Sequence, residues 1–333
     1  MKIKVGINGM GRIGRMIIRS IIENNKKNIE IKHINNRTSA EACSNLLKHD
    51  SIHGKFNAKV NFDENHLIIN KNKITFSQET DLNNINWKKY DVDYVFECTG
   101  KFNSKENLTP HLDNGAKKVI VSAPCKNADR TIVFGVNQSE LRKKDNIISA
   151  ASCTTNCLAP VAHVLHENFE IEKGFMTTIH AFTSDQRILD NSHKDPRRAR
   201  SASQSIVPTS TGASKAIGEI IPSLKGKLEG VAMRVPIPNV SLVELVFCTK
   251  KNLSIEKINS AFLGFSKKNK VLEITNEKLV SIDFNHNPAS SVVDASLTNV
   301  VGKNMGKISA WYDNEWGFSN RMCDIVEYIQ KIS

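Results

Sequence analysis

The chain has 333 residues, of which 40% are hydrophobic and 24% charged, which is long enough for two domains with separate cores. No stretch approaches the ~20 uncharged apolar residues of a membrane-spanning helix, so the composition excludes an integral membrane protein. The 46 Lys and Arg residues against 34 Asp and Glu give a net charge of +12. We interpret this charge as a solvated basic surface; the alternative is that it attracts multiply phosphorylated small molecules.

The amino terminus and the cysteines indicate a cytoplasmic protein. Residues 1–5 enter a strand pattern at once, which leaves no room for the apolar core of a secretory signal. The seven cysteines are an odd number without a disulfide spacing, so we expect free thiols in a reducing compartment. Cys98 and Cys248 are expected to be buried structural residues.

The first half of the chain alternates short apolar strands with helical segments. A strand at residues 3–8 runs through a glycine-rich turn into a helix at 12–23, and a second strand follows at 29–35. Further strands are predicted at 94–97, 118–121, 132–134 and 147–150, with a helix at 104–114. This order predicts an α/β fold with a Rossmann-type doubly wound sheet, as a dinucleotide-binding domain over residues 1–151.

The pattern changes in the second half. Long β-rich runs with few helices between them lie at residues 174–182, 230–235, 242–249 and 308–312. They predict an α+β catalytic domain over residues 152–315 with a mainly antiparallel sheet. The tail, about residues 316–333, has helical periodicity, and we expect it to pack back on the first domain.

The turn after the first strand matches the pattern G-x-G-x-x-G. Gly9 permits the tight turn, Gly11 lets the main chain approach a pyrophosphate, and Gly14 lets the next helix pack close to the strand. The N–H groups and the dipole at the start of that helix favour an anion. Because the motif stands between a strand and a helix, it predicts a site for NAD or NADP.

The end of the second strand bears on the choice between these cofactors. Sites specific for NAD place an acidic residue roughly 20 positions after the turn, where this chain has Asn36, followed by Arg37, Thr38 and Ser39. These side chains supply hydrogen-bond donors where the 2′-phosphate of NADP would bind. We expect NADP or dual use; the alternative is that Asn36 alone holds the ribose of NAD while Arg37 points to solvent.

A candidate nucleophile opens the second half. Ser152 is a good N-cap, which places Cys153 in the first turn of a helix, where main-chain N–H groups stabilise a thiolate. Cys157 lies one turn deeper on the same face, so we expect Cys157 to be buried and Cys153 to be the exposed nucleophile. The rival interpretation is a metal site of Cys153, Cys157, His163 and His166, but helical spacing does not converge these side chains on one point. We therefore expect no metal.

His180 is the candidate base. It follows the run 176–179, and a neutral imidazole within reach of the thiol would take and return its proton. The pattern alone leaves His53, His163 and His193 as alternatives. Segments 197–200 and 208–212, together with Arg234, offer guanidinium and hydroxyl donors for phosphate groups.

These residues together give the chain a resemblance to the phosphorylating glyceraldehyde-3-phosphate dehydrogenase family. The matching segments occur in the family's order over nearly the full length, at residues 6–15, 151–160, 193–195, 208–213, 234–236 and 311–315. The resemblance implies an NAD(P)-dependent oxidoreductase of glycolysis or gluconeogenesis and a cytoplasmic homotetramer. Residues 182–203 resemble the loop that reaches the cofactor site of a neighbouring subunit.

The resemblance also implies roles for individual residues. Cys153 attacks the aldehyde of glyceraldehyde 3-phosphate with His180 as its base, hydride passes to nicotinamide, and inorganic phosphate cleaves the thioester to give 1,3-bisphosphoglycerate. Thr183 and Arg234 are implied to hold the C3 phosphate of the substrate. The implied contacts of inorganic phosphate are Ser152, Thr154, Arg198, Thr211 and Gly212, and those of the cofactor are Arg12, Ile13, Ser122 and Asn314, the last beside the nicotinamide amide.

Two departures from the family pattern concern the cofactor. Asn36 stands where NAD-using members carry Asp, and Thr80 stands in the adenine-side loop where many members carry Arg or Lys. Both favour NADP or dual use, and an NADP-linked form would suit the biosynthetic direction.

The runner-up function is an erythrose-4-phosphate dehydrogenase with the same fold, cysteine and histidine. The alternative that is not an enzymatic function is a secondary RNA-binding activity of the basic surface.

Overall fold

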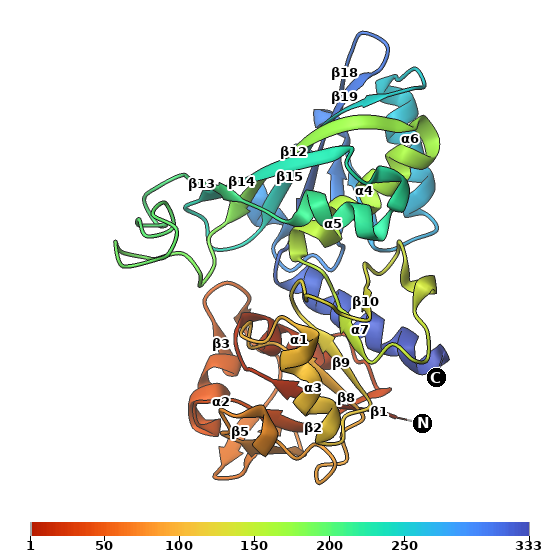
Figure 1. The fold of residues 1–333 in the computed structure, drawn as a ribbon. Helices are drawn as coiled ribbons and strands as arrows, with labels where there is room; N and C mark the ends of the chain where they lie inside the picture. Colours follow the sequence, from red (N-terminus) through yellow and green to blue (C-terminus); the bar gives the residue numbers. More distant parts are fainter. Residues whose placement is uncertain (1, 333) are drawn as a thin grey trace. The chain divides into compact units, whose positions relative to one another are not determined.

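The computed structural model describes residues 2–332, which form two compact units (Figure 1). The first unit comprises the chain through Phe134, Gln138–Ser152 and the segment from Ser319 onward. The second unit comprises Gly135–Asn137 and Cys153–Phe318. No helix within residues 2–332 is both long and apolar enough to cross a membrane.

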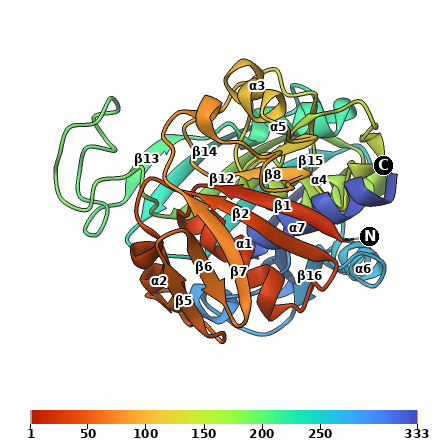
Figure 2. The ribbon, with the colours of Figure 1, turned by 90° about the horizontal axis from the view of Figure 1, so that it is seen from below.

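The first unit is built on a nine-stranded sheet, part of which is seen from below in Figure 2. Its order is β10 (Arg130–Thr131), β11 (Ile147–Ser149), β9 (Lys118–Val121), β8 (Tyr94–Glu97), β1 (Ile3–Asn8), β2 (Ile29–Asn35), β7 (Asn72–Ser77), β6 (His66–Ile69) and β5 (Val60–Asp63). Neighbouring strands are parallel from β10 through β7, and β7, β6 and β5 form an antiparallel edge. The predicted doubly wound sheet is therefore confirmed.

Helices α1 (Arg12–Glu23), α2 (Ala40–Lys48) and α3 (Lys105–Asp113) lie wholly in this unit. Ser39 and Ser104 begin α2 and α3 as N-caps, each accepting a main-chain N–H three residues later. A short antiparallel ribbon of β3 (His49–Asp50) and β4 (Gly54–Lys55) follows α2.

One predicted strand of the first unit is wrong. Residues 132–134 were expected to form a strand, but the ladder beside β11 ends at Thr131. Ile132 and Val133 are fully buried, and the Ile132 N–H donates to the carbonyl of Ser149 just beyond the ladder. These residues are apolar because they are buried, while the chain leaves the sheet toward Gly135, which has a positive φ of 93°.

The second unit contains an eight-stranded mixed sheet. Its order is β13 (Val207–Ser210), β14 (Leu228–Val235), β12 (Ile171–Ala181), β15 (Ser241–Thr249), β19 (Met305–Tyr312), β17 (Ser291–Asp294) and β16 (Leu272–Thr275), with β18 (Asn299–Val301) also paired to β19. The β12–β14 and β16–β17 pairs are parallel and the remaining pairs are antiparallel. The expected mainly antiparallel sheet is present.

Helices α4 (Cys153–Phe169), α5 (Ala213–Ile220) and α6 (Ile255–Ser266) accompany this sheet, and α4 contacts both α5 and α6. Strand β15 alternates strictly between fully and partly buried residues, which is typical of a strand covered more on one face than on the other. Cys248, expected to be buried, lies on the less covered face of β15 and is only partly buried, whereas Cys98 is buried.

The final helix, α7 (Trp316–Ile332), starts in the second unit and continues in the first from Ser319. Asn320 Oδ1 accepts hydrogen bonds from Ser20 Oγ at 2.9 Å and from Asn24 Nδ2 at 2.7 Å. Lys26 Nζ lies 2.8 Å from a carboxylate oxygen of Glu327. These contacts fix the helix against the C-terminal part of α1.

Candidate active site

Each of the three glycines of the dinucleotide turn is required for a different structural reason. Gly9 has a φ of +98°, and a Cβ there would lie 2.8 Å from the main-chain nitrogen of Thr99. A Cβ on Gly14 would lie 2.0 Å from the carbonyl oxygen of Gly9, so helix and turn could not approach as they do. A Cβ on Gly11 would meet no protein atom closer than 3.9 Å. The need for glycine at position 11 therefore comes from outside the chain, as expected where a pyrophosphate approaches.

The N-terminus of α1 is suited to an anion. Gly11 is its N-cap and provides no side-chain hydrogen bond, and the first turn contains no acidic residue. The Arg12 guanidinium is held by Asp50 through contacts of 2.5 and 3.0 Å. Burial alone would raise the pKa of Asp50, but hydrogen bonds from Arg12 and two main-chain N–H groups hold it well below its usual range. Ile13 is partly exposed beside Arg12.

A chain of buried hydrogen bonds joins the carboxyl ends of β8, β1 and β2. Glu97 accepts from Asn8 Nδ2 at 2.6 Å and from the main-chain nitrogen of Thr99 at 2.8 Å. Asn8 Oδ1 in turn accepts from Asn35 Nδ2 at 2.8 Å. Since Thr99 abuts Gly9, this chain of bonds fixes the shape of the dinucleotide turn.

The predicted cofactor-selecting residues follow β2 at the same edge of the sheet. Asn36 donates through its amide nitrogen to Thr38 Oγ1 at 2.7 Å, and Arg37, Thr38 and Ser39 are exposed. No carboxylate occupies position 36. Ser122, partly exposed, directly follows β9, and its main-chain nitrogen donates to the Glu97 carbonyl at 3.0 Å.

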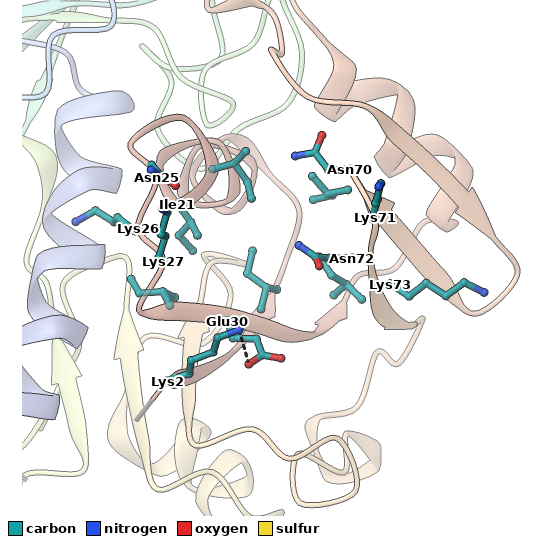
Figure 3. A pocket seen from close by; sticks show the side chains of 15 residues that line it. Lys2, Ile21, Asn25, Lys26, Lys27, Glu30, Asn70, Lys71, Asn72 and Lys73 are labelled. Atoms are coloured by element: carbon teal, nitrogen blue, oxygen red, sulfur yellow. Dashed lines mark ion pairs between the residues drawn. The ribbon is translucent and has the colours of Figure 1, made fainter.

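A hollow of about 690 Å³ in the first unit lies away from these residues (Figure 3). Ile29 and Glu30 at the start of β2, together with Asn70 and Lys71 of the β6–β7 turn, are part of its lining. The dinucleotide turn instead follows the carboxyl end of β1. The hollow contains none of the predicted cofactor residues.

In the second unit the structure brings Cys153 and His180 together. Cys153 is the first residue of α4, His180 is near the end of β12, and Cys153 Sγ lies 3.5 Å from His180 Nε2. Cys153 is partly exposed and Cys157 is fully buried, with its thiol directed at the Ala310 carbonyl. Among residues 2–332, no group of three or more His, Cys, Asp or Glu side chains could hold a metal ion.

The rival histidines of the second unit have other partners. The ring of His163 packs edge-on against Phe265 at 5.9 Å. His193 Nδ1 accepts the main-chain N–H of Asp195 at 2.9 Å, and its Nε2 lies 3.5 Å from Asp185. His53 belongs to the first unit.

Burial favours the uncharged forms of both Cys153 and His180. Burial, together with the positive charge of Arg234, lowers the pKa of His180 to about 3. Burial raises the pKa of the Cys153 thiol, although the charge of Arg234 and hydrogen bonds from Thr154 oppose the change. Burial thus acts against the thiolate that the start of the helix was expected to stabilise. A neutral base beside the thiol can instead activate Cys153 by taking its proton.

Arg234 lies directly beside the base. Strands β12 and β14 pair in register, with His180 opposite Arg234, and Arg234 Nη1 lies 2.7 Å from His180 Nδ1. The Nε atom of Arg234 is buried and has no hydrogen-bond partner among residues 2–332. An anion with several acceptor oxygens would complete the hydrogen bonding of this guanidinium.

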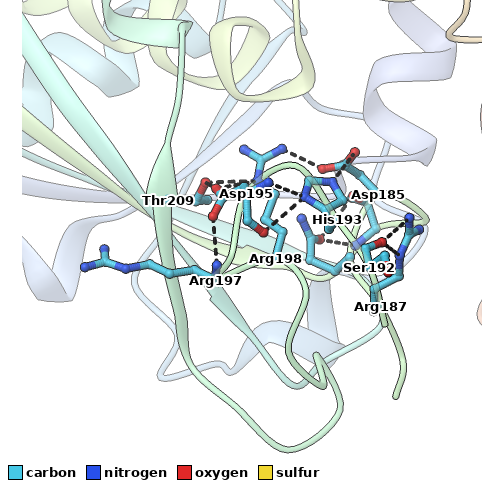
Figure 4. Close-up of polar contacts among 10 residues, drawn as sticks. Asp185, Arg187, Ser192, His193, Asp195, Arg197, Arg198 and Thr209 are labelled. Carbon is cyan, nitrogen blue, oxygen red and sulfur yellow. Dashed lines mark hydrogen bonds and ion pairs between the residues drawn. The ribbon is translucent and has the colours of Figure 1, made fainter. Parts of the chain in front are cut away.

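Arg198 is held by carboxylates in the loop after β12 (Figure 4). Its Nη1 lies 2.5 Å from Asp185 Oδ2, its Nε donates to Thr209 Oγ1 at 2.9 Å, and Asp195 lies 3.6 Å from Nε. An incoming phosphate at Arg198 would compete with Asp185.

The other residues that are predicted to bind phosphate lie at the start of α4, after β12 and before α5. Thr183 donates through its main-chain nitrogen to Gln186 Oε1 at 2.8 Å. Thr211 and Gly212 precede α5, and a Cβ on Gly212 would meet nothing within 4 Å. Thr154 is buried, and its hydroxyl lies 2.9 Å from Tyr312 OH. Ser152 immediately precedes α4 in the chain.

Asn314, the predicted nicotinamide contact, is joined to β12 by Ser241, a residue that sequence analysis missed. Ser241 Oγ donates to Asn314 Oδ1 at 2.9 Å and accepts from the main-chain nitrogen of Ala181 at 3.1 Å. Tyr312 was also missed, and its hydroxyl lies 2.9 Å from both Thr154 Oγ1 and Thr178 Oγ1. Only the position of Tyr312 two residues before Asn314 could have signalled it.

A doubly wound sheet with a dinucleotide-type turn, together with a second unit in which a cysteine lies beside a histidine, places the chain in the class of NAD(P)-dependent oxidoreductases. The glyceraldehyde 3-phosphate dehydrogenase NAD-binding domain matches residues 3–105, and the C-terminal domain of the same family matches residues 152–314. The chain belongs to the glyceraldehyde-3-phosphate dehydrogenase family.

Curated relatives agree with this assignment. Glyceraldehyde-3-phosphate dehydrogenase 2 of Bacillus subtilis is 49% identical over 332 residues, which is 99% of this chain and 97% of that protein. The glyceraldehyde-3-phosphate dehydrogenase of Geobacillus stearothermophilus is also 49% identical, over 99% of this chain and 98% of that protein. The enzyme of that name from Cereibacter sphaeroides is 49% identical over 97% of each chain.

Proposed function

We infer that this chain catalyses the reversible, phosphate-dependent oxidation of D-glyceraldehyde 3-phosphate to 1,3-bisphosphoglycerate, with NAD or NADP as hydride acceptor. The observation that carries the inference is the 3.5 Å approach of Cys153 Sγ to His180 Nε2, beside the incompletely paired cation of Arg234. The family and the names of its curated members support the substrate.

The reaction follows from the neutral pair. His180 Nε2 takes the thiol proton as the sulfur of Cys153 adds to the aldehyde carbon, and passes it to the former carbonyl oxygen, giving a hemithioacetal and a neutral base again. The base then takes the hydroxyl proton as the C1 hydride leaves, which produces a thioester on Cys153. The nicotinamide, when bound, accepts that hydride. Inorganic phosphate attacks the thioester, and the thiolate of Cys153 leaves and regains its proton.

The phosphate groups would bind at the cationic and hydroxyl-bearing residues of the second unit. The C3 phosphate of the substrate is assigned to Arg234 and Thr183, because Arg234 lies beside the base and is only partly hydrogen-bonded. Inorganic phosphate is assigned to the group Ser152, Thr154, Arg198, Thr211 and Gly212. Since the Thr154 hydroxyl is engaged by Tyr312, Thr154 would contribute its main-chain N–H.

The cofactor proposal is NADP or dual use. Gly9, Gly11 and Gly14, with Arg12, Ile13 and Ser122, would hold the dinucleotide, and Asn314 the nicotinamide amide. At the adenosine ribose, position 36 is a neutral amide, and Arg37 is an exposed cation next to it. A 2′-phosphate there meets a positive charge and no carboxylate. The assembly proposed from the family is a cytoplasmic homotetramer.

The test is the initial rate with glyceraldehyde 3-phosphate, measured with NAD and with NADP, each with and without inorganic phosphate. Phosphate-dependent reduction of either cofactor is expected, and absence of turnover with both would overturn the proposal. Parallel kcat/KM values for erythrose 4-phosphate check the runner-up substrate. A higher value for that aldehyde would replace the proposed substrate.

A further inference from the structure

Gln186, in the loop after β12, has a buried amide whose orientation is fixed. Within residues 182–201 it is the only buried residue, and it is just 3% exposed. Its Oε1 accepts the main-chain N–H of Thr183 at 2.8 Å and the Thr183 hydroxyl at 3.2 Å. Because a main-chain N–H can only donate, Oε1 and Nε2 cannot be exchanged. The NH₂ group of Gln186 therefore faces away from the Thr183 N–H.

This NH₂ group is a buried donor without an acceptor. Gln186 Nε2 makes no hydrogen bond to any of residues 2–332. The neighbouring charged side chains are engaged within the loop, Asp185 with Arg198 at 2.5 Å and Arg187 with a main-chain carbonyl at 3.0 Å (Figure 4). A buried N–H without an acceptor costs free energy. A ligand that supplies an acceptor oxygen to Nε2 is therefore favoured.

The start of this loop runs beside the segment that follows Arg234. The N–H of Phe182 donates to the carbonyl of Ile237 at 3.1 Å. Burial lowers the pKa of Arg234, and the negative charge of Asp185, the residue before Gln186, is among those that oppose the change. The Nε of Arg234 is also a buried donor without a partner in the described part of the chain. Two incompletely hydrogen-bonded donors thus belong to neighbouring segments of the second unit.

We propose that Gln186 is a third residue of the site for the C3 phosphate, with Nε2 donating to a phosphate oxygen while Oε1 holds Thr183 in place. This inference rests on the proposed function, which assigns that phosphate to Arg234 and Thr183. The three terminal oxygens of the phosphate are strong acceptors. They meet three kinds of donor: the Arg234 guanidinium, the Thr183 hydroxyl and the Gln186 amide. When the Thr183 hydroxyl turns to the phosphate, Oε1 still accepts the Thr183 N–H.

This contact makes Gln186 a residue that selects phosphorylated aldehydes. An aldehyde without phosphate leaves the buried Nε2 without an acceptor, and a site built to hydrogen-bond a substrate group rejects the analogue that lacks it. The loss of the Gln186 amide should therefore affect the phosphorylated substrate and spare D-glyceraldehyde.

The first test replaces the donor and keeps the acceptor. In Gln186→Glu one carboxylate oxygen can still accept the Thr183 N–H, whereas the other faces the phosphate in place of Nε2. At about pH 8.5, well above the ordinary pKa of Glu, kcat/KM for glyceraldehyde 3-phosphate should fall by at least about tenfold, as expected for one lost hydrogen bond to a charged group. The value for D-glyceraldehyde should remain close to that of wild type. An unchanged value for the phosphorylated aldehyde, or an equal loss for both aldehydes, would overturn the proposal.

Gln204→Glu is the matched control. Gln204 is exposed and lies shortly after the same loop, so the same substitution adds the same charge without burying it. Both aldehydes should react as in wild type. If glyceraldehyde 3-phosphate lost as much kcat/KM here as in Gln186→Glu, the added charge alone would be responsible, and the proposal would be wrong.

A comparison of double variants separates direct contact with phosphate from an effect through Thr183. Gln186→Met removes both the donor and the acceptor. It should lower kcat/KM for glyceraldehyde 3-phosphate in wild type and again in Thr183→Ala, where no hydroxyl is left to hold. No further loss in Thr183→Ala would show that Gln186 acts only by holding that hydroxyl. If Gln186→Met does not fold, Gln186→Glu still decides, because it keeps the bond to the Thr183 N–H.

Binding of glycerol 3-phosphate, measured by calorimetry, tests the contact without turnover. Gln186→Glu should bind this probe more weakly than wild type by at least about tenfold, and Gln204→Glu should bind it as wild type does. Equal affinities of wild type and Gln186→Glu would overturn this inference. If wild type binds the probe but does not oxidise glyceraldehyde 3-phosphate, the proposed function fails while this contact stands.

Discussion

The side-chain carbonyl of Asn36 accepts a hydrogen bond from the main-chain nitrogen of Met10 at 3.0 Å. This bond ties the residue after β2 to the dinucleotide turn, while the amide nitrogen of Asn36 is directed at Thr38 Oγ1. An aspartate at position 36 could keep the bond to Met10, since a carboxylate oxygen also accepts. It would lose the donor and add a negative charge at the proposed position of the 2′-phosphate.

We therefore expect Asn36→Asp to shift cofactor preference toward NAD. The ratio of kcat/KM for NAD to that for NADP should rise on the order of tenfold or more, because a charge-assisted contact is replaced by like-charge repulsion. Steady-state kinetics with both cofactors measures this ratio. Asn36→Ser, which adds no charge, serves as the control and should leave the preference close to that of wild type. An equal effect of both changes would refute the electrostatic explanation.

Sequence analysis predicted well the helices and strands in which the apolar residues of the sequence pattern are also the residues that the structure buries. Strands β1, β2, β8 and β9 and helix α1 occur with the expected bounds, since each is bounded by turn or capping residues. The short strand β13, with Pro208 inside it, was not predicted, because beyond Val207 its residues are partly buried or exposed. Its pairing with β14 depends on distant residues and leaves no local pattern.

The chemistry of the site was predictable only in part. Cys153 and His180 could be proposed from their places on a helix start and a strand end, and the structure puts Sγ and Nε2 3.5 Å apart. The raised pKa of Cys153 could not be foreseen, since it results from burial by residues far apart in sequence. The same holds for Ser241, whose link between Ala181 and Asn314 is created by strand pairing.

The glycine turn gives a matched pair of substitutions. Gly11→Ala should leave the free energy of unfolding within about 0.5 kcal/mol, since its Cβ would meet nothing closer than 3.9 Å and its φ is −70°. It should nevertheless weaken binding of NAD and NADP. Gly14→Ala should destabilise the protein by about 1–3 kcal/mol or more, because its Cβ would collide with the Gly9 carbonyl. Thermal unfolding and cofactor titration by fluorescence separate the two effects; equal effects on stability would contradict the assignment.

The two cysteines of α4 offer a second matched pair. Cys153→Ser should lower turnover by at least about 10³-fold, as expected when a nucleophile is removed. Cys157→Ser should keep most of the activity, because its side chain is fully buried and directed at the Ala310 carbonyl, to which a serine hydroxyl can also donate. Initial rates, with cofactor binding as the check on folding, provide the measurement. Loss of turnover in Cys157→Ser alone would reverse the assignment.

The pH dependence of the base follows from its lowered pKa. With a pKa of about 3 in the folded protein, His180 stays neutral above pH 5, whereas an ordinary histidine becomes protonated near pH 6.5. The kcat/KM for D-glyceraldehyde, whose lack of phosphate avoids a second titration near pH 6, should therefore show no decline around pH 6.5. His180→Asn should lower the rate by about 10²–10⁴-fold at all these pH values. An acid limb near pH 6.5 that disappears in His180→Asn would show that the base titrates normally.

Glu97 gives the last prediction, because both oxygens of its side chain accept hydrogen bonds. Oε2 accepts from Asn8 Nδ2 at 2.6 Å and contacts His111 Nε2 at 3.1 Å, while Oε1 accepts from the main-chain nitrogen and the hydroxyl of Thr99. Trp87 donates to His111 Nδ1 at 2.9 Å, so the proton of the neutral ring is on Nε2 and points at Glu97.

In Glu97→Gln, an amide NH₂ must replace one of these oxygens and would face donors on either side. We expect a loss of about 1–3 kcal/mol in the free energy of unfolding, and weaker cofactor binding, since Thr99 would no longer be held against Gly9. His111→Gln is the control: it releases only one of the contacts and leaves Thr99 in place, so it should destabilise the protein with less effect on cofactor affinity. Denaturant unfolding and cofactor titration of both variants test this, and an unaltered affinity in Glu97→Gln would show that Thr99 does not position the turn.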